Sequence, residues 1–403
     1  ENNDNNNILI LKEESNFWYT TTTNSKKEEE DKLPSHNNLD TDGPLPDDCY
    51  YKFDNNENPS SFCRIGIDLS QNDDDDDDDL LTNYLHKCID CGLPTFYGGT
   101  PTVYRNLISD TPQTVLDECN LVTSVFVPEV SSSSFDAREL LLSPLYERGS
   151  NSIDTIQLHY NYKSIDYNNK NNKLEYYYYF MEILNVASDL QREGIIRSIV
   201  GHRIPLDLLE EIKKESADII ESNQLPSNVL NPYSDQSSDN LVFDNTLAGG
   251  LLSHQYYYKR RKEPFLYELS NSVRENLNDL YQWSSRGTSD KNTDNRWNTF
   301  QKNIMDVLYD LSNKYSVSSS IDLIAMRYAL QMTNNVKGIV VDNNDNDPER
   351  LRRLFEFHLE DDDIDRLWEA SRCLRSEDVE EEENYDDDDY YERETTKSGL
   401  FLP

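Results

Sequence analysis

A histidine ends the apolar stretch IDTIQLH, which runs from Ile153 to His159. Histidine changes its charge near neutral pH, so it can act as a general acid or base. Two interpretations are open: His159 is a functional residue at the end of a strand, or it is a hydrogen-bonded histidine of the core. The sequence offers no second catalytic motif, since it contains no His-Glu-x-x-His, no Walker loop and no Gly-x-Gly-x-x-Gly.

The acidic and cysteine residues predict no metal site. Cys88 and Cys91 form the one Cys-x-x-Cys pair among six cysteines, and no second pair completes a zinc site. We therefore expect Cys88 to pack within a helix. The seven consecutive aspartates at 73–79 lack the spaced ligands and the glycine of a calcium loop, and this run predicts a solvated loop.

The charge of the chain limits its partners. The formal net charge is −39, from 38 basic and 77 acidic residues, and such a surface repels nucleic acid and anionic lipid. No apolar run approaches the ~20 residues that span a bilayer, so we expect a soluble, cytoplasmic protein. The chain begins at Glu1 rather than at methionine, which leaves an organellar or processed form open.

Composition divides the chain into three parts. Residues 1–60 are rich in Asn, Asp, Glu and Thr and predict a mostly disordered segment, and 376–403 predict an acidic tail of the same kind. Residues 61–375 are predicted to form one domain. The two flanks are therefore not expected to position the chemistry.

Short apolar runs alternate with amphipathic helices in the middle part. The runs are CRIGIDL, NLVTSVFV, IDTIQL, IIRSIV, NLVF and KGIVV. In the helix predicted before Gly194, one face carries Phe180, Ile183, Leu184, Ala187 and Leu190, and Gly194 supplies the C-cap. Repeated strand–helix units form either a doubly wound sheet or an eight-stranded barrel, and periodicity does not choose between them.

The order of five phrases resembles that of the aldo/keto reductase family. The phrases are IDTIQLH (153–159), LQREGIIRSIV (190–200), SNQ (222–224), LAGGLL (247–252) and MRYALQ (326–331). The resemblance implies a (β/α)8 TIM barrel whose chemistry lies at the carboxyl ends of the strands. It also implies hydride transfer from NADPH to a carbonyl, with His159 orienting that carbonyl.

The family's proton donor is a tyrosine whose pKa is lowered by a lysine, and a buried aspartate pairs with that lysine. The resemblance places Tyr97 at the position of the aspartate, Thr102 at that of the tyrosine and Ser124 at that of the lysine. A two-residue slip would offer Tyr104 as the donor instead. Losing both members of the pair avoids a stranded buried charge, which costs ~3–5 kcal/mol, so the departures are consistent with decay of the site.

The resemblance also assigns candidate contacts for NADP. Gln224, preceded by Asn223, matches the residue that binds the nicotinamide carboxamide, and Phe243 would replace the stacking tyrosine if the chain bulges by one residue. Gly249 and Gly250 match the loop that approaches the pyrophosphate, although they also suit a simple tight turn.

Other positions depart from the family's cofactor site. The family's Ser-Asn after strand five is His202-Arg203 here. Asp342 would repel a 2′-phosphate unless Arg350, Arg352 or Arg353 compensates for it. The basic run KRRK (259–262) is either a phosphate contact or a solvated loop.

Two hypotheses for the function follow. The first is an NADP-dependent oxidoreductase that acts on a small carbonyl or alcohol, with His159 as the orienting residue and Tyr104 or Tyr97 as the proton donor. The second is a catalytically inactive barrel that senses the cofactor or serves as a binding scaffold.

Overall fold

The structure, a computed structural model, describes residues 45–52, 61–70, 78–128, 136–160, 170–215, 219–233, 240–258, 273–274, 276, 293–315, 320–342 and 347–375. Residues 1–44, the tail 376–403, most of the aspartate run and the basic run 259–262 lie outside the described residues.

Eight parallel strands close into a barrel in the order β10-β3-β4-β5-β6-β7-β8-β9. The predicted (β/α)8 TIM barrel is confirmed. The strands are β3 (Ile65–Asp68), β4 (Thr95–Tyr97), β5 (Asn120–Phe126), β6 (Ile153–His159), β7 (Ile196–His202), β8 (Asn223–Pro226), β9 (Leu241–Asp244) and β10 (Val336–Asp342). Because all eight run in the same direction, their carboxyl ends gather at one end, which we call the mouth.

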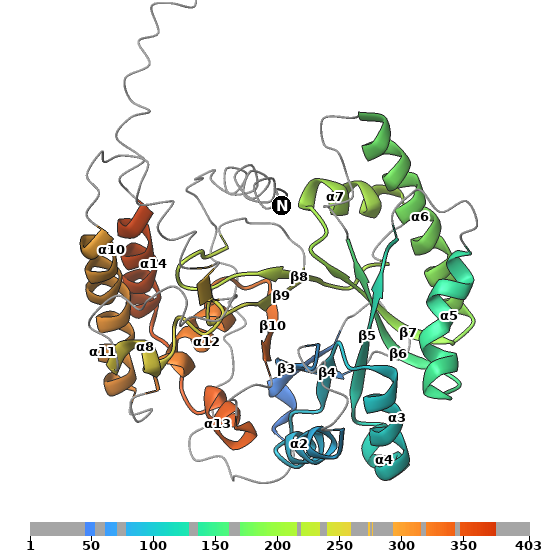
Figure 1. Cartoon of the computed structure of the whole chain (residues 1–403), viewed down its shortest axis with the longest axis horizontal. Coiled ribbons are helices and arrows are strands. Elements are labelled where there is room, and N and C mark those ends of the chain that lie inside the picture. The colour runs from blue at the N-terminus through green and yellow to red at the C-terminus, as the bar shows by residue number, and fades with distance from the viewer. Residues whose placement is uncertain are drawn as a thin grey trace, which may run out of the picture.

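Helices surround the barrel (Figure 1). Figure 1 shows α10, α11 and α14 side by side at one end of the view and α5, α6 and α7 at the other. The helices are α2 (Asp78–Asp90), α3 (Pro101–Asp110), α4 (Gln113–Leu116), α5 (Ala137–Arg148), α6 (Lys170–Arg192), α7 (Leu206–Glu215), α8 (His254–Tyr258), α10 (Thr293–Phe300), the π-helical η5 (Gln301–Met305), α11 (Asp306–Lys314), α12 (Ile321–Gln331), α13 (Pro348–Arg352) and α14 (Asp361–Arg375); short 3-10 turns are η1 (Asp47–Cys49) and η6 (Arg353–Phe355).

A hairpin precedes the barrel. Strands β1 (Tyr50–Lys52) and β2 (Ser61–Cys63) pair antiparallel, so part of the segment 1–60 contributes a strand. Tyr51 and Phe62 of this hairpin are buried with Val122 and Val200, side chains from two barrel strands. Since β2 leads into β3 at the amino end of the barrel, the hairpin places its aromatic side chains in the interior opposite the mouth.

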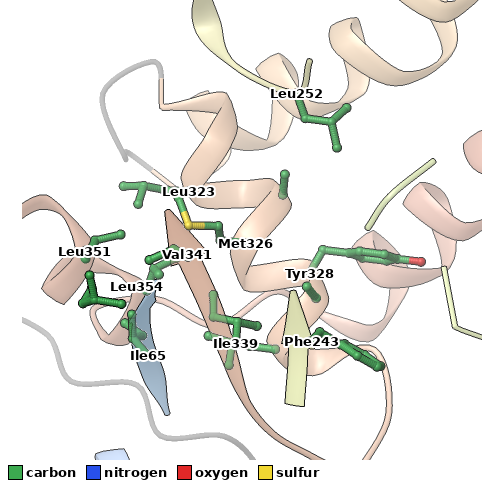
Figure 2. Close-up of a cluster of buried hydrophobic side chains, with 14 of the residues drawn as sticks. Ile65, Phe243, Leu252, Leu323, Met326, Tyr328, Ile339, Val341, Leu351 and Leu354 are labelled. Atoms are coloured by element: carbon green, nitrogen blue, oxygen red, sulfur yellow. The ribbon is translucent and has the colours of Figure 1, made fainter. Parts of the chain in front are cut away.

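The main core lies between the strands and the outer helices. Figure 2 shows Leu323, Met326 and Tyr328 of α12 beside Ile339 and Val341 of β10. Helix α6 packs as the sequence predicts, since five side chains of one face are fully buried: Phe180, Ile183, Leu184, Ala187 and Leu190. Gly194 follows the helix with a φ of 74°, the left-handed conformation of the predicted C-cap. Within the described part of the chain, no helix combines the length and the apolar character that crossing a bilayer requires.

Candidate active site at the barrel mouth

Alternating strand residues point into the barrel, and they form two layers. The lower layer is apolar and aromatic, and it holds Tyr97, Val122, Val200, Val242 and Val340 together with the hairpin residues. Two residues further along several of these strands stand the polar side chains of the mouth. They are Asp68, Ser124, Gln157, His159, His202, Gln224, Asp244 and Asp342. The mouth is thus a rim of polar side chains above an apolar interior.

A hydrogen-bonded chain links four side chains of the rim. His159 Nε2 lies 3.1 Å from Gln157 Oε1, and Gln157 Nε2 donates to Gln224 Oε1 at 2.6 Å. Gln224 Nε2 then donates to Asp244 Oδ2 at 2.9 Å, an oxygen that also lies 3.4 Å from His202 Nε2. An amide oxygen only accepts hydrogen bonds, so this geometry assigns the proton of His159 to Nε2. The donors therefore all point toward Asp244.

His159 is held as a neutral ring. Burial, with the charges of His202 and Arg203, lowers its pKa from 6.5 to about 3. The ring lies between two aromatic neighbours, with centroids 4.3 Å from Phe126 and 4.2 Å from His202, and its plane is tilted by 35° and 38° to theirs. Strand register explains these ring contacts, because Phe126, His159 and His202 are paired positions on β5, β6 and β7. His159 thus lies at the mouth, but its Nε2 proton is directed to Gln157.

Three carboxylates stand on the opposite strands. Asp68 and Asp342 are paired positions on β3 and β10, and Asp244 ends β9. Burial, the main cause, and the repulsion from the other aspartates raise the pKa of Asp342 and, despite hydrogen bonds from Ser70, that of Asp68. Burial also acts to raise the pKa of Asp244, but hydrogen bonds and the charges of His202 and Arg203 outweigh it, so that pKa is lowered. Asp244 stays ionised.

Tyr97 lies inside the barrel below the rim. Its ring fills the space above Gly66, where an added Cβ would stand 2.4 Å from Tyr97 Cε2. Its hydroxyl hydrogen-bonds with Tyr51 of the hairpin, and burial, the main cause, raises its pKa. Because the hydroxyl points toward the hairpin, Tyr97 does not present it to His159.

Tyr104 lies outside the barrel wall, beneath helix α3. Its hydroxyl is 3.1 Å from Phe96 O and 3.0 Å from Val122 O, and it accepts the Gly99 N–H at 3.1 Å. The Arg148 guanidinium covers the ring at 4.2 Å, and burial raises the pKa of Tyr104 to about 12. The prediction that a two-residue slip brings Tyr104 to the mouth is at odds with this geometry, because its hydroxyl is fully engaged with the main chain.

The residues that the resemblance places at the family's lysine and tyrosine positions have small hydroxyl side chains. Ser124 faces the rim, where its Oγ lies 3.5 Å from Gln157 Oε1, and Thr102 is exposed on α3. Lys337 is the single lysine in the eight barrel strands, and it lies near the amino end of β10, away from the mouth. The strands therefore bring no ammonium group to the rim.

Comparison with known proteins identifies the family. A model of the aldo/keto reductase family matches residues 137–372, more than half of the chain. The chain belongs to the aldo/keto reductase family. A search of curated proteins by sequence gives no match.

Solved aldo/keto reductases share the fold at low identity. A glycerol dehydrogenase from Gluconobacter oxydans superposes with a TM-score of 0.56 at 15% identity, over 81% of this chain and 96% of that one. An aldo-keto reductase of the silkworm Bombyx mori gives a TM-score of 0.54 at 12% identity, over 80% of this chain and 87% of that one. A structure of an aldo-keto reductase of the same designation complexed with NADPH superposes equally well.

The cofactor contacts that the family suggests are occupied by other partners here. Gln224, at the nicotinamide position, is bonded on both sides within the rim. Asn223 points the other way, where its side chain binds the main-chain N–H and oxygen of Ile204 and so fastens the loop after β7. Phe243 packs outward against Tyr233 at 5.5 Å, within the core drawn in Figure 2, rather than over the mouth.

The residues suggested as phosphate contacts also have other hydrogen-bond or ion-pair partners. The N–H of Gly249 donates to Asn245 Oδ1 at 2.7 Å, and that of Gly250 donates to Leu247 O, so the loop closes on itself as a tight turn. Among the described arginines near the end of β10, Arg350 pairs with Asp322 and Arg352 binds Cys91 O.

Arg203 directly follows β7 at the rim, and its charge is one of the causes that lower the pKa of Asp244. It adopts a φ of 56°, and its N–H donates to Gln224 O at 2.8 Å. With Asp342 and Asp68 beside that carboxylate, the rim carries more negative than positive charge. The described residues of this aldo/keto reductase therefore do not fit the phosphates of a dinucleotide.

Sequence reasoning missed the two residues that organise the rim. Gln157 joins the family's histidine to its glutamine, and Phe126 flanks the histidine from β5. The alternation of inward positions from Val122 would have placed Phe126 and Ser124 on the same side. Asp244 followed the predicted strand NLVF directly, and only the barrel register brings it to His202. Among the described residues, no group of three or more His, Cys, Asp or Glu side chains is placed to hold a metal ion. Cys88 is buried in α2, as predicted.

Proposed function

We propose that this member of the aldo/keto reductase family is a catalytically inactive barrel that binds a small molecule at its mouth. One observation carries the proposal: neither candidate proton donor presents its hydroxyl to His159. Tyr97 directs its hydroxyl to Tyr51, and Tyr104 is held by Gly99 and by main-chain oxygens. A general acid contributes ~10²–10⁴ to the rate, so a reductase without one would be slow.

The rim supports the same conclusion. Carbonyl reduction needs a donor aimed at the developing oxyanion, and carboxylates at that place oppose negative charge. Here Asp244 is ionised and the Nε2 proton of His159 is directed to Gln157. The arrangement suits binding more than it suits hydride acceptance by a carbonyl.

The second candidate is an NADP-dependent oxidoreductase acting on a carbonyl or alcohol substrate. The neutral state of His159 favours it, because an uncharged ring at the end of β6 is what orienting a carbonyl requires. In that case a small-molecule carbonyl would have to displace Gln157 from His159 Nε2.

Turnover of NADPH distinguishes the two candidates. The full chain is mixed with NADPH and a panel of reactive aldehydes and quinones, and loss of the reduced nicotinamide is followed by absorbance. We expect no oxidation above the protein-free rate, with the aldo-keto reductase that was solved in complex with NADPH as the control. Oxidation that His159→Ala slows would refute the inactive-barrel proposal and establish the reductase.

A further inference from the structure

Helix α6 has a hollow on its outer face, beside the end of α7; both helices lie at the same end of the view in Figure 1. Its volume is about 530 Å³, and seven side chains line it: Tyr178, Met181, Glu182, Asn185, Val186, Asp189 and Glu215. The helical period places Tyr178 and Glu182 opposite Phe180, which is fully buried in the core. The hollow therefore follows the solvent-facing side of α6 for about three turns, roughly 17 Å.

The floor of the hollow is apolar, and an exposed ring stands at one end of it. Met181 belongs to the core beneath α6, and Val186 packs against the same core. Tyr178 is 62% exposed, although its ring meets that of Tyr177 edge-on at 5.8 Å. A tyrosine that points away from the core adds little to folding, whereas its burial by a second chain is favourable, and tyrosine is enriched among the residues that dominate binding energy.

The edge of the hollow is negatively charged. Glu182, Asp189 and Glu215 line it, and its lining includes no lysine or arginine. Two of these carboxylates have partners within the chain, since Asp189 pairs with Arg192 and Glu215 accepts a hydrogen bond from the Tyr177 hydroxyl. Three carboxylates against one guanidinium leave the hollow negative, so a complementary occupant is basic. A second copy of this chain is a poor occupant, because its formal net charge of −39 opposes self-association.

We propose that the outer face of α6 docks a basic amphipathic helix of another protein. Apolar side chains along one stripe of that helix enter the hollow between Tyr178 and Val186. Lysine or arginine side chains beside the stripe lie against Glu182 and Glu215, at the two sides of the hollow. The length of the hollow fits about three turns of a helix packed alongside α6. This surface lies outside the barrel, so the docked helix goes beyond the function proposed for the mouth and does not depend on it.

Three fluorescently labelled peptides of about fifteen residues test the proposal. The first has leucines at helical spacing and lysines elsewhere, the second has the same leucines with glutamates, and the third has the leucine–lysine composition in an order without an apolar stripe. Each is titrated with the full chain at physiological salt, and binding is followed by anisotropy. We expect the first peptide to bind saturably, about tenfold or more tightly than the third, and the second not to bind. Equal binding of the first and third peptides would reveal attraction to acidic surface in general and would overturn the proposal.

Matched variants locate the bound peptide on α6. Tyr178→Ala should weaken binding of the leucine–lysine helix at least about tenfold, and Glu182→Gln about two- to fivefold. The controls lie on α5: Tyr146→Ala removes a ring that is 69% exposed, and Glu139→Gln removes a charge from the first turn. Both controls should bind the peptide as the unaltered chain does. Unchanged binding by Tyr178→Ala, or an equal loss in Tyr146→Ala, would mean that the peptide binds elsewhere, and the proposal would be wrong.

A blocking variant and a test of self-association complete the experiment. Asn185→Arg places a long cationic side chain in the middle of the hollow and should weaken binding at least about tenfold, while thermal unfolding of this exposed-site variant stays unchanged. Sedimentation of the chain alone should show no dimer that Tyr178→Ala dissociates. Such a dimer would assign the hollow to a second copy of the chain and refute docking of a basic partner.

Discussion

Replacing Tyr104 tests whether its hydroxyl has a structural role in the barrel wall or a catalytic role as a proton donor. In Tyr104→Phe the ring remains under Arg148, but the Gly99 N–H loses its acceptor. Leaving a partly buried N–H without a hydrogen-bond acceptor costs ~1–3 kcal/mol. We therefore expect the free energy of unfolding to fall by about 2 kcal/mol, a structural effect with no catalytic component.

Equilibrium unfolding in urea measures this change. Tyr146→Phe is the control, because Tyr146 is 69% exposed and its variant should differ by less than ~0.5 kcal/mol. A proton donor behaves in the opposite way, since its phenylalanine variant keeps its stability and loses ~10²–10⁴ in rate. An unchanged unfolding midpoint for Tyr104→Phe would refute the assignment of Tyr104 to the wall of the barrel.

Three further predictions concern the interior, the mouth and the loop after β7. Gly66→Ala should cost ~1–3 kcal/mol by pushing on the Tyr97 ring, and a double-mutant cycle with Tyr97→Leu should show that most of this cost disappears without the ring. His159 has a pKa lowered to about 3, so its contribution to stability is complete above pH ~6.5 and is lost as the pH falls toward 3; His159→Gln should remove a slope of up to ~1.4 kcal/mol per pH unit from urea unfolding below pH ~6.5. Asn223→Ala should lower stability by ~1–3 kcal/mol because Ile204 loses two hydrogen bonds, and thermal unfolding would contradict this if it were unchanged.

The sequence predicts the six strands with apolar runs and misses β4 and β8. Six apolar runs correspond to β3, β5, β6, β7, β9 and β10, because a strand of four to seven residues with buried side chains leaves a readable pattern. β4 has three residues and β8 has the polar sequence NQLP, so periodicity cannot detect either of them. Their positions followed only from the resemblance to the family.

The candidate site was predictable as far as single strand ends. His159 and Gln224 were found because each ends or begins a recognisable phrase, and both lie on the rim. The three carboxylates of the rim were not predictable as a group, since Asp68 and Asp342 come from opposite ends of the domain and meet only when the barrel closes. Phe243 was assigned to the mouth only on the condition of a one-residue bulge, and it packs in the outer core instead, because one residue of register decides which way a strand side chain faces.

The lower layer of the barrel is packed in a way that does not suit a buried ammonium–carboxylate pair. The resemblance to the family places Tyr97 at the position of the aspartate, and the neighbouring strand provides room for the Tyr97 ring with Gly66. Val122 and Val200 complete a layer in which an ammonium–carboxylate pair would lose its hydration without gaining other hydrogen bonds. With this layer filled by tyrosine and valine, the charged side chains of the interior stand at the rim, where Asp68, Asp244 and Asp342 end their strands. We therefore expect an aspartate–lysine pair introduced into this layer to destabilise the barrel, because its interior is packed around the Tyr97 ring.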